Sequence, residues 1–387
     1  MAAAASPGKP DVHGTPRNDT GRPCLLTAVN CVTPDTTMAH AGGKIILLGE
    51  HAVVYGVPAL AAGIDLGVHA SASAAPWHAS PTAGAAARLQ ACRLSVTPWD
   101  VTVSASAPTP DAKGAEAGLA RALSALLTTY AAPLERYGPA WVHAEVQLPA
   151  GAGLGCSAAL GVAVVRALDA HWKVARSALD QAELSLAWER VFHGNPSGVD
   201  NVMAACGGVA CFQRGAPLRQ IDLPRPLRLV VAHSGEKAST EVMVQQVAAL
   251  RQAARPQVDA ALANIHSLVQ GAERALMRRD MHALGEAMCA NQAQLCALKV
   301  STPRLDALCQ TAMQAGALGS KLTGSGGGGA MIALVSGAAC EAAVCAALQA
   351  AGAEPFAVDI QSRPPEAAHA TRPRGAALRH AAAMEAP

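Results

Sequence analysis

The sequence predicts a protein of mixed helices and strands that is divided into two domains. Residues 142–148 alternate apolar with polar side chains, as a half-buried strand does, and run into a glycine-rich loop and then an apolar helix. A proline-bearing stretch from Gly215 to Pro226 is the candidate domain boundary. Beyond it we expect helices at 241–254 and 259–279, then a second glycine-rich loop and a strand at 330–335. The 387 residues suffice for two domains of ordinary size.

The composition favours a globular protein and disfavours several classes of partner. Hydrophobic residues make up 51% of the chain and aromatic residues only 3%, so we expect a sizeable core of Ala, Val and Leu. The formal net charge is +2 without a basic stripe, which argues against nucleic acid and anionic membranes. No apolar run is long enough for a membrane-spanning helix. The 11 cysteines show no CxxC pair and no zinc-type spacing, so reduced thiols in a cytoplasmic protein are expected.

The two ends of the chain are expected to lie outside the folded domains. Residues 1–37 are rich in Pro, Thr, Ala and Gly and lack the apolar segment of a secretory signal. We interpret them as a disordered extension, with translation from Met38 as the alternative. Residues 362–387 consist largely of Ala, Pro, Arg and His and are expected to form a disordered tail. The folded domains would then cover 38–215 and 216–361.

Several elements of the first domain can be placed from local patterns. The apolar run that begins at Lys44 and ends at Gly49 predicts a buried strand. A helix is expected from about residue 116 to 130. Ser177 and Asp180 give the capping signal of another helix, which the sequence Gly194-Asn-Pro-Ser-Gly198 ends. One face of that helix carries Leu184, Ala187, Trp188 and Val191.

The loop Gly151-Ala-Gly-Leu-Gly-Cys-Ser157 has the properties of a phosphate-binding loop. Its glycines permit a close backbone approach to a ligand, and the helix that follows offers free N–H groups to an anion. A serine at the start of that helix could also bind Mg²⁺. The loop is neither a Walker A motif nor a dinucleotide fingerprint, because the spacing is wrong for both. A tight turn without a ligand is the alternative.

The second glycine run, Gly324 to Gly329, is interrupted only by Ser325. So many glycines are entropically costly unless something requires bare main chain there. A flexible linker is the alternative, but predicted elements flank the run on both sides. We therefore expect an ordered loop.

Charged residues near these loops are candidates for catalysis. Glu189 and Asp200 could divide the work, one holding Mg²⁺ and the other accepting a hydroxyl proton. Lys44, at the start of a buried strand, could neutralise phosphate or keep Asp200 ionised. Exposed acids, a surface lysine and a structural His51 are the alternatives.

Together these segments resemble the GHMP small-molecule kinase family. Three motifs appear in the family's order, at residues 43–56, 148–159 and 321–329. The segments 189–201 and 234–240 are similar to the mevalonate kinases, a branch of that family. The resemblance spans Ala39 to Ile360. It implies a two-domain α+β fold, with an N-terminal ribosomal-protein-S5-domain-2-like domain that binds ATP and a C-terminal ferredoxin-like domain.

The resemblance also implies roles for individual residues. Asp200 would be the base and Lys44 its partner, while Ser157 and Glu189 would hold Mg²⁺. The residues implied to bind ATP are Pro149, Gly151, Ala152, Gly153, Leu154, Gly155, Cys156 and Ser157. Those implied to bind the substrate are Lys44, Glu50, His51, Asp200 and Thr240. Support for the phosphate loop is assigned to Gly326, Gly327 and Gly328.

The activity implied by the resemblance is transfer of the ATP γ-phosphoryl group to the 5-hydroxyl of (R)-mevalonate, a step of isoprenoid biosynthesis that needs Mg²⁺. The partner would be this small molecule, and a homodimer is the assembly carried as a hypothesis. Another GHMP kinase, such as phosphomevalonate kinase, and a non-catalytic metabolite-binding regulator remain alternatives. Galactokinase is disfavoured because Ala52 stands where its motif has Asp. Cys156 and Ser325 depart from the family's usual Ser and small apolar residue, which puts the β-phosphate contact in doubt.

Overall fold

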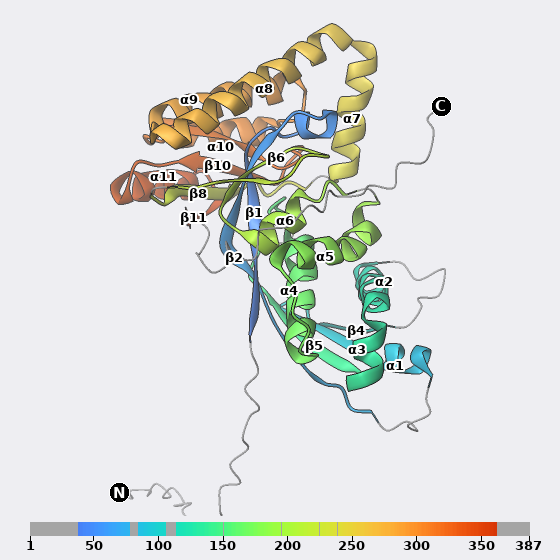
Figure 1. Cartoon of the computed structure of the whole chain (residues 1–387). Coiled ribbons are helices and arrows are strands. Elements are labelled where there is room, and N and C mark those ends of the chain that lie inside the picture. The colour runs from blue at the N-terminus through green and yellow to red at the C-terminus, as the bar shows by residue number, and fades with distance from the viewer. Residues whose placement is uncertain are drawn as a thin grey trace, which may run out of the picture. The chain divides into compact units, whose positions relative to one another are not determined.

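The computed structural model describes residues 38–77, 84–105, 114–149, 151–194, 196–223, 225–237 and 239–361. The predictions for 1–37 and 362–387 lie outside these residues. Within the described part of the chain, the strands form two sheets (Figure 1). No helix in this part of the chain combines the length and apolarity needed to span a membrane.

The first sheet has seven strands in the order β4-β3-β5-β2-β6-β7, with β1 paired to β2. All neighbours run antiparallel except β3 and β5, which are parallel. The predicted strand at Lys44 and the alternating strand at 142–148 are confirmed as parts of β1 and β5. The strands are β1 Ala39–Leu48, β2 Ala59–Ala74, β3 Arg93–Thr97, β4 Val101–Ser104, β5 Ala140–Val146, β6 Val209–Phe212 and β7 Arg219–Ile221.

Helix α4 packs against β1, β2 and β5, and α5 and α6 pack against it. Nearly all of α4 from Ala158 to Asp169 is buried, as expected for a helix that is apolar on all sides. The predicted capping box at Ser177 is confirmed at the start of α5. The helical segments are η1 Ala52–Tyr55, α1 Ala85–Ala91, α2 Ala115–Leu127, η2 Thr128–Tyr130, α3 Ala131–Tyr137, α4 Cys156–His171, α5 Ala178–His193 and α6 Val199–Cys206.

The second sheet is antiparallel, with the order β11-β8-β10-β9. Its strands and helices alternate as in a ferredoxin-like βαββαβ unit with extra helices inserted between the first two strands. The predicted helices at 241–254 and 259–279 are confirmed as α7 and α8. The elements are β8 Leu227–His233, α7 Thr240–Ala253, α8 Arg255–Arg278, α9 Met281–Ala297, α10 Pro303–Gln314, β9 Gly319–Thr323, β10 Ala330–Leu334, α11 Ala338–Ala350 and β11 Glu354–Ile360.

The stretch predicted as a domain boundary contains a strand. β7 pairs with β6 through Arg219, Gln220 and Ile221, so the first sheet extends to Ile221. The second sheet begins at Leu227. The passage between the sheets is therefore shorter than the range from Gly215 to Pro226.

Helix α9 lies directly on strand β9 because two glycines face each other. A Cβ atom on Gly285 would stand 2.2 Å from the carbonyl oxygen of Leu318, and one on Gly319 would stand 2.3 Å from that of Gly285. Neither neighbour can yield, since both are backbone atoms. This contact sets the depth of β9, which leads into the second glycine loop.

We expect Gly285→Ala to lower the free energy of unfolding by at least about 2 kcal/mol, because the new methyl group must push α9 away from β9. Urea unfolding followed by circular dichroism measures the change. Gly271→Ala in α8 is the matched control, since its Cβ would meet only the end of the Arg274 side chain at 4.0 Å. That control should gain about 0.5–1 kcal/mol, the usual helix preference for Ala. Equal stabilities for the two variants would contradict the proposed close contact.

Candidate active site

The first glycine loop links β5 to α4 and places bare backbone at the start of a buried helix. Gly151, Gly153 and Gly155 have φ angles of 75°, 74° and 74°, in the left-handed region that favours glycine. The side chains of Ala152 and Leu154, between them, are buried in the core, and Pro149 is exposed just before the loop. The loop can therefore offer a ligand its main chain but not these two apolar side chains. The predicted order of strand, glycine loop and helix is confirmed.

Lys44 and Asp200, assigned to catalysis from the sequence, lie together beside this loop. The Nζ atom of Lys44 stands 2.9 Å from Oδ1 of Asp200 and donates to the carbonyl of Gly153 at 3.3 Å. A Cβ atom at Gly155 would stand 3.0 Å from Cγ of Lys44, so this glycine leaves room for the lysine stem. Burial lowers the pKa of Lys44 to about 8, against the opposing effect of the Glu50 and Glu189 carboxylates.

Asp200 is the second residue of α6, whose N-cap Gly198 has φ of 83°. Its side chain is 34% exposed, whereas that of Lys44 is 7% exposed. The carboxylate of Asp200 is therefore partly open to solvent, while the lysine is buried. The preceding turn includes Asn195, which lies outside the described residues.

Ser157 and Glu189, predicted to hold Mg²⁺, are also brought together. The Ser157 hydroxyl donates to Oε1 of Glu189 at 2.5 Å, and His193 lies 3.6 Å from the other carboxylate oxygen. Burial raises the pKa of Glu189, while the bond from Ser157 opposes the shift. Mg²⁺ in nucleotide sites commonly takes one or two protein oxygens and completes its shell with phosphates and water. The two oxygens fit that pattern, and no group of three or more metal-binding side chains occurs among the described residues.

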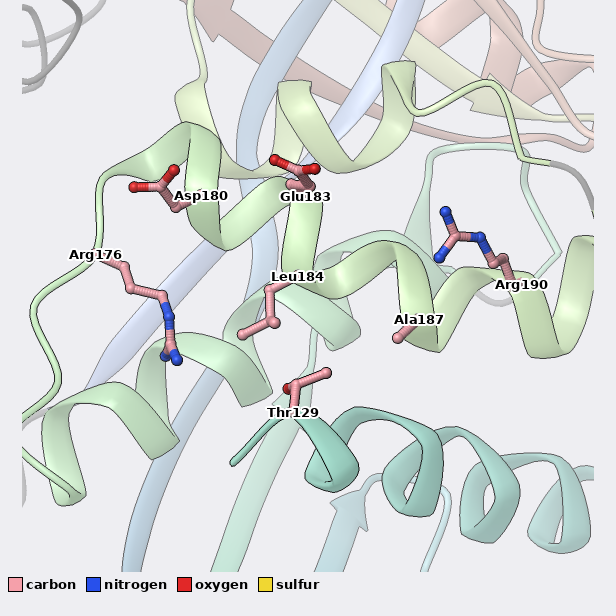
Figure 2. Close-up of a pocket in the computed structure, with 7 residues that line it drawn as sticks. All are labelled: Thr129, Arg176, Asp180, Glu183, Leu184, Ala187 and Arg190. Carbon is pink, nitrogen blue, oxygen red and sulfur yellow. The ribbon is translucent and has the colours of Figure 1, made fainter. Parts of the chain in front are cut away.

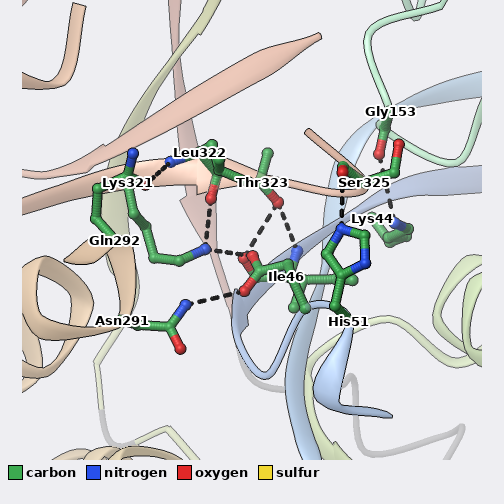
Figure 3. A network of polar contacts seen from close by, with 11 residues as sticks. Lys44, Ile46, His51, Gly153, Asn291, Gln292, Lys321, Leu322, Thr323 and Ser325 are labelled. Carbon is green, nitrogen blue, oxygen red and sulfur yellow. Dashed lines mark hydrogen bonds and ion pairs between the residues drawn. The ribbon is translucent and has the colours of Figure 1, made fainter. Parts of the chain in front are cut away.

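Glu50, predicted to bind the substrate, has protein partners for its carboxylate group. Figure 3 shows a network of polar contacts that includes Lys321 and Asn291. The buried Lys321 forms an ion pair with Oε1 of Glu50. Asn291 donates to Oε2 of the same carboxylate at 3.1 Å. Burial raises the pKa of Glu50 and lowers that of Lys321, and each group opposes the shift of the other. Both carboxylate oxygens thus have protein partners, and the sequence reasoning missed Lys321 and Asn291 as those partners.

Thr323 joins β9 to β1 through its hydroxyl group. The backbone N–H of Ile46 donates to Oγ1 of Thr323 at 2.9 Å, and that hydroxyl donates to the carbonyl of Ile46 at 3.1 Å (Figure 3). Thr323 is 1% exposed. The Thr323 side chain therefore satisfies two backbone groups at the edge of β1 that would otherwise need a neighbouring strand. Ile46 is two residues from Lys44, so this contact sets the depth of the strand that carries the lysine.

His51 and Thr240, both predicted to bind the substrate, meet at Ser325. The Nε2 atom of His51 lies 2.8 Å from the Ser325 carbonyl oxygen, and the Thr240 hydroxyl donates to the Ser325 hydroxyl at 3.3 Å. Burial lowers the pKa of His51. Ser325, which stands where the family usually has a small apolar residue, thus supplies a hydrogen-bond partner for Thr240.

The second glycine loop is ordered and held by neighbouring backbone. Gly327 donates to the carbonyl of Val300 at 2.8 Å, and a Cβ atom at Gly326 would stand 2.1 Å from that oxygen. A Cβ atom at Gly328 would stand 2.8 Å from the backbone of Glu236. The loop therefore packs where no side chain fits, and the flexible-linker alternative is wrong.

Cys156, the other departure, opens α4 at the end of the first loop. Burial and the nearby Glu189 carboxylate raise the pKa of its thiol to about 11. The thiol is therefore neutral at physiological pH and a weak hydrogen-bond donor.

A shallow hollow of about 390 Å³ lies elsewhere, between α5 and the end of α2 (Figure 2). Arg176 and Arg190 stand toward its two sides, with Glu183 and Asp180 between them in the chain. Arg176 already pairs with Asp169. The lining residues are Thr129, Arg176, Asp180, Glu183, Leu184, Ala187 and Arg190, none of which belongs to the predicted site.

Comparison with known proteins gives the same assignment as the motifs. Residues 118–208 match the family model described as the GHMP kinases N terminal domain, and residues 272–354 match the GHMP kinases C terminal model. Over 333 residues the chain is 32% identical to the mevalonate kinase of Thermococcus sibiricus, covering 84% of this chain and 96% of that protein. The chain belongs to the GHMP kinase family. The mevalonate kinase of Methanothermobacter thermautotrophicus is 32% identical over 297 residues, which cover 76% of this chain and 89% of that protein.

Solved structures of GHMP kinases share the fold. The structure of L. major mevalonate kinase in complex with R-mevalonate matches with a TM-score of 0.71 and 26% identity, covering 84% of this chain and 96% of that one. The Methanococcus jannaschii mevalonate kinase matches with a TM-score of 0.71 at 21% identity, over 85% of this chain and 100% of that one. The expected two-domain α+β fold is confirmed.

We expect Thr323→Val to lower the free energy of unfolding by about 2–4 kcal/mol, because it leaves the buried N–H and carbonyl of Ile46 without partners. Thr323→Ser keeps the hydroxyl group and should lose markedly less. Urea unfolding of the two variants beside the wild type measures the difference. A valine variant as stable as the serine variant would show that the hydroxyl does not join the two strands.

Proposed function

We propose that this GHMP kinase transfers the γ-phosphoryl group of ATP to the 5-hydroxyl group of (R)-mevalonate. The observation that carries the proposal is the Lys44–Asp200 pair at 2.9 Å, set beside a glycine loop that opens a buried helix. Relatives at 32% identity that bear the name mevalonate kinase support this choice of acceptor.

Phosphoryl transfer demands positioning and positive charge more than a strong base. Its transition state is loose and spreads negative charge over the transferred oxygens. Asp200, partly open to solvent, would accept the hydroxyl proton. Lys44 would favour the ionised form of Asp200 and stand near the migrating group. Asp200 would thus act on the acceptor hydroxyl group, and Lys44 on the transferred phosphoryl group.

ATP would lie with its phosphates along the backbone of the first glycine loop, where free N–H groups at the start of α4 favour an anion. Ser157 and Glu189 would hold Mg²⁺, which supplies charge neutralisation to the phosphates when bound. His51 and Thr240, joined through Ser325, would border the acceptor. Cytoplasmic location and a homodimer remain predictions.

The fold alone does not select the acceptor. A Lactococcus lactis galactokinase and a Streptococcus pneumoniae phosphomevalonate kinase, both at 19% identity, match with TM-scores of 0.66 and 0.67. The alternatives from the sequence, another GHMP kinase or a regulator, are therefore decided by the acceptor test.

With Mg²⁺ and ATP, the purified protein should release ADP in the presence of mevalonate but not of phosphomevalonate or galactose. A coupled assay of ADP release makes the comparison. Turnover with another acceptor alone would keep the kinase and discard mevalonate. Normal ATP binding without any turnover would favour the regulator.

Asp200→Asn should lower kcat with mevalonate by about 100-fold or more, the usual contribution of a general base, while ATP binding is retained. The amide has the size of the carboxylate but cannot take the proton. Glu183→Gln, an exposed acid on α5 in the hollow of Figure 2, is the matched control and should keep full activity. Turnover of the asparagine variant near the wild-type rate would remove Asp200 from the chemistry.

A further inference from the structure

Lys237 lies against the first glycine loop although it belongs to the segment after β8. Its Cδ and Cε atoms are 3.6 Å from the position that a Cβ atom on Gly151 would take. The residue is exposed, and no hydrogen bond or ion pair joins its ammonium group to another described residue. The aliphatic stem therefore rests on the loop while the charge is left for another partner.

The backbone that carries Lys237 is fixed by the second glycine loop. Gly329 donates to the carbonyl of Glu236 at 2.9 Å, and Ser234 donates to the carbonyl of Gly329 at 2.8 Å. The Thr302 hydroxyl donates to the Glu236 carboxylate at 2.7 Å. These bonds hold the residue just before Lys237 from two sides. The lysine is thus presented to the first loop by a braced segment and not by a free chain end.

The second and first glycine loops also lie against each other. A Cβ atom at Gly329 would stand 3.4 Å from the carbonyl oxygen of Ala152, and one at Gly324 would stand 3.3 Å from that of Gly153. The segment that carries Lys237 is therefore bonded to the second loop, which in turn lies against the first. Because the stem of Lys237 rests against Gly151, its ammonium group lies beside the first loop.

The other two lysines near the loops already have carboxylate partners. Lys44 pairs with Asp200, and the buried Lys321 pairs with Glu50. A nucleotide triphosphate brings more negative charge than one magnesium ion neutralises. Lys237 is the lysine of this group whose charge has no acid partner among the described residues.

We propose that Lys237 binds the phosphates of the nucleotide from the side of the second sheet, as a further contact of the ATP site. The inference rests on the proposed function for the presence of ATP, but not for the identity of the acceptor. Lysine is a compact charge with three rotatable donors, which can bind phosphate oxygens without a fixed geometry.

Lys237→Met is the decisive variant, because it removes the charge and keeps the stem that rests on Gly151. Lys173→Met is the matched control, since Lys173 is exposed just beyond the C-terminal end of α4, the end opposite the loop. Dissociation constants for Mg²⁺-ADP are measured by titration calorimetry at about 50 mM and about 500 mM salt. ADP needs no acceptor, so the result stands whether or not mevalonate is the substrate.

We expect Lys237→Met to bind Mg²⁺-ADP about five- to tenfold more weakly at low salt, with a smaller difference at high salt because screening weakens the contact. Lys237→Arg should retain most of the affinity, and the control should match the wild type. Wild-type affinity of the methionine variant at low salt would overturn the proposal. A raised KM for mevalonate with unchanged ADP binding would also overturn it, by placing Lys237 at the acceptor's carboxylate.

Discussion

The hydroxyl group of Thr323 is the contact on which the arrangement of the site depends. It satisfies both backbone groups of Ile46 and so attaches the second sheet to the edge strand of the first. Lys44 stands two residues before Ile46, and the second glycine loop begins directly after Thr323. The contact between Thr323 and Ile46 therefore positions both Lys44 and the start of the second glycine loop. A buried backbone group left without a partner would cost more than the bond itself contributes, so the junction resists slipping.

Two ion pairs near this junction, Lys321–Glu50 and Lys44–Asp200, differ in their exposure to solvent. Lys321 and Glu50 are wholly buried, and such a pair is weak evidence for stability because desolvation offsets the attraction. Its geometry has a clearer consequence, since it fixes the end of β1 against β9 from inside. Lys44 and Asp200 form the open pair, with the acid partly exposed. The buried pair thus joins two strands from inside, whereas the pair at Asp200 is open to solvent, where the proposed reaction would use it.

The features that depend on residues close together in the chain could be predicted from the sequence. The strand at Lys44, the glycine loop, the capped helix α5 and the pairing of Ser157 with Glu189 follow from signals within a few dozen residues or from the family motifs. The partner of Glu50 could not be found this way, because Lys321 is 271 positions away and only the folded chain brings them together. A lysine within an otherwise uncharged strand was the available signal, since a buried lysine requires an acid. β7 was missed because three residues between prolines give too short a pattern.

The two departures from the family pattern have different consequences for the site. The Ser325 hydroxyl bonds to Thr240 and its carbonyl to His51, so these two residues, which would border the acceptor in the proposed site, gain a polar connection. Cys156 puts a neutral thiol at the start of α4, where a serine hydroxyl would donate more strongly to a phosphate. In the proposed site this loss would fall on the nucleotide side, where backbone N–H groups and cations would compensate. Lys237 stands over that same loop, which gives a physical reason for a lysine at this position in a chain that carries Cys156.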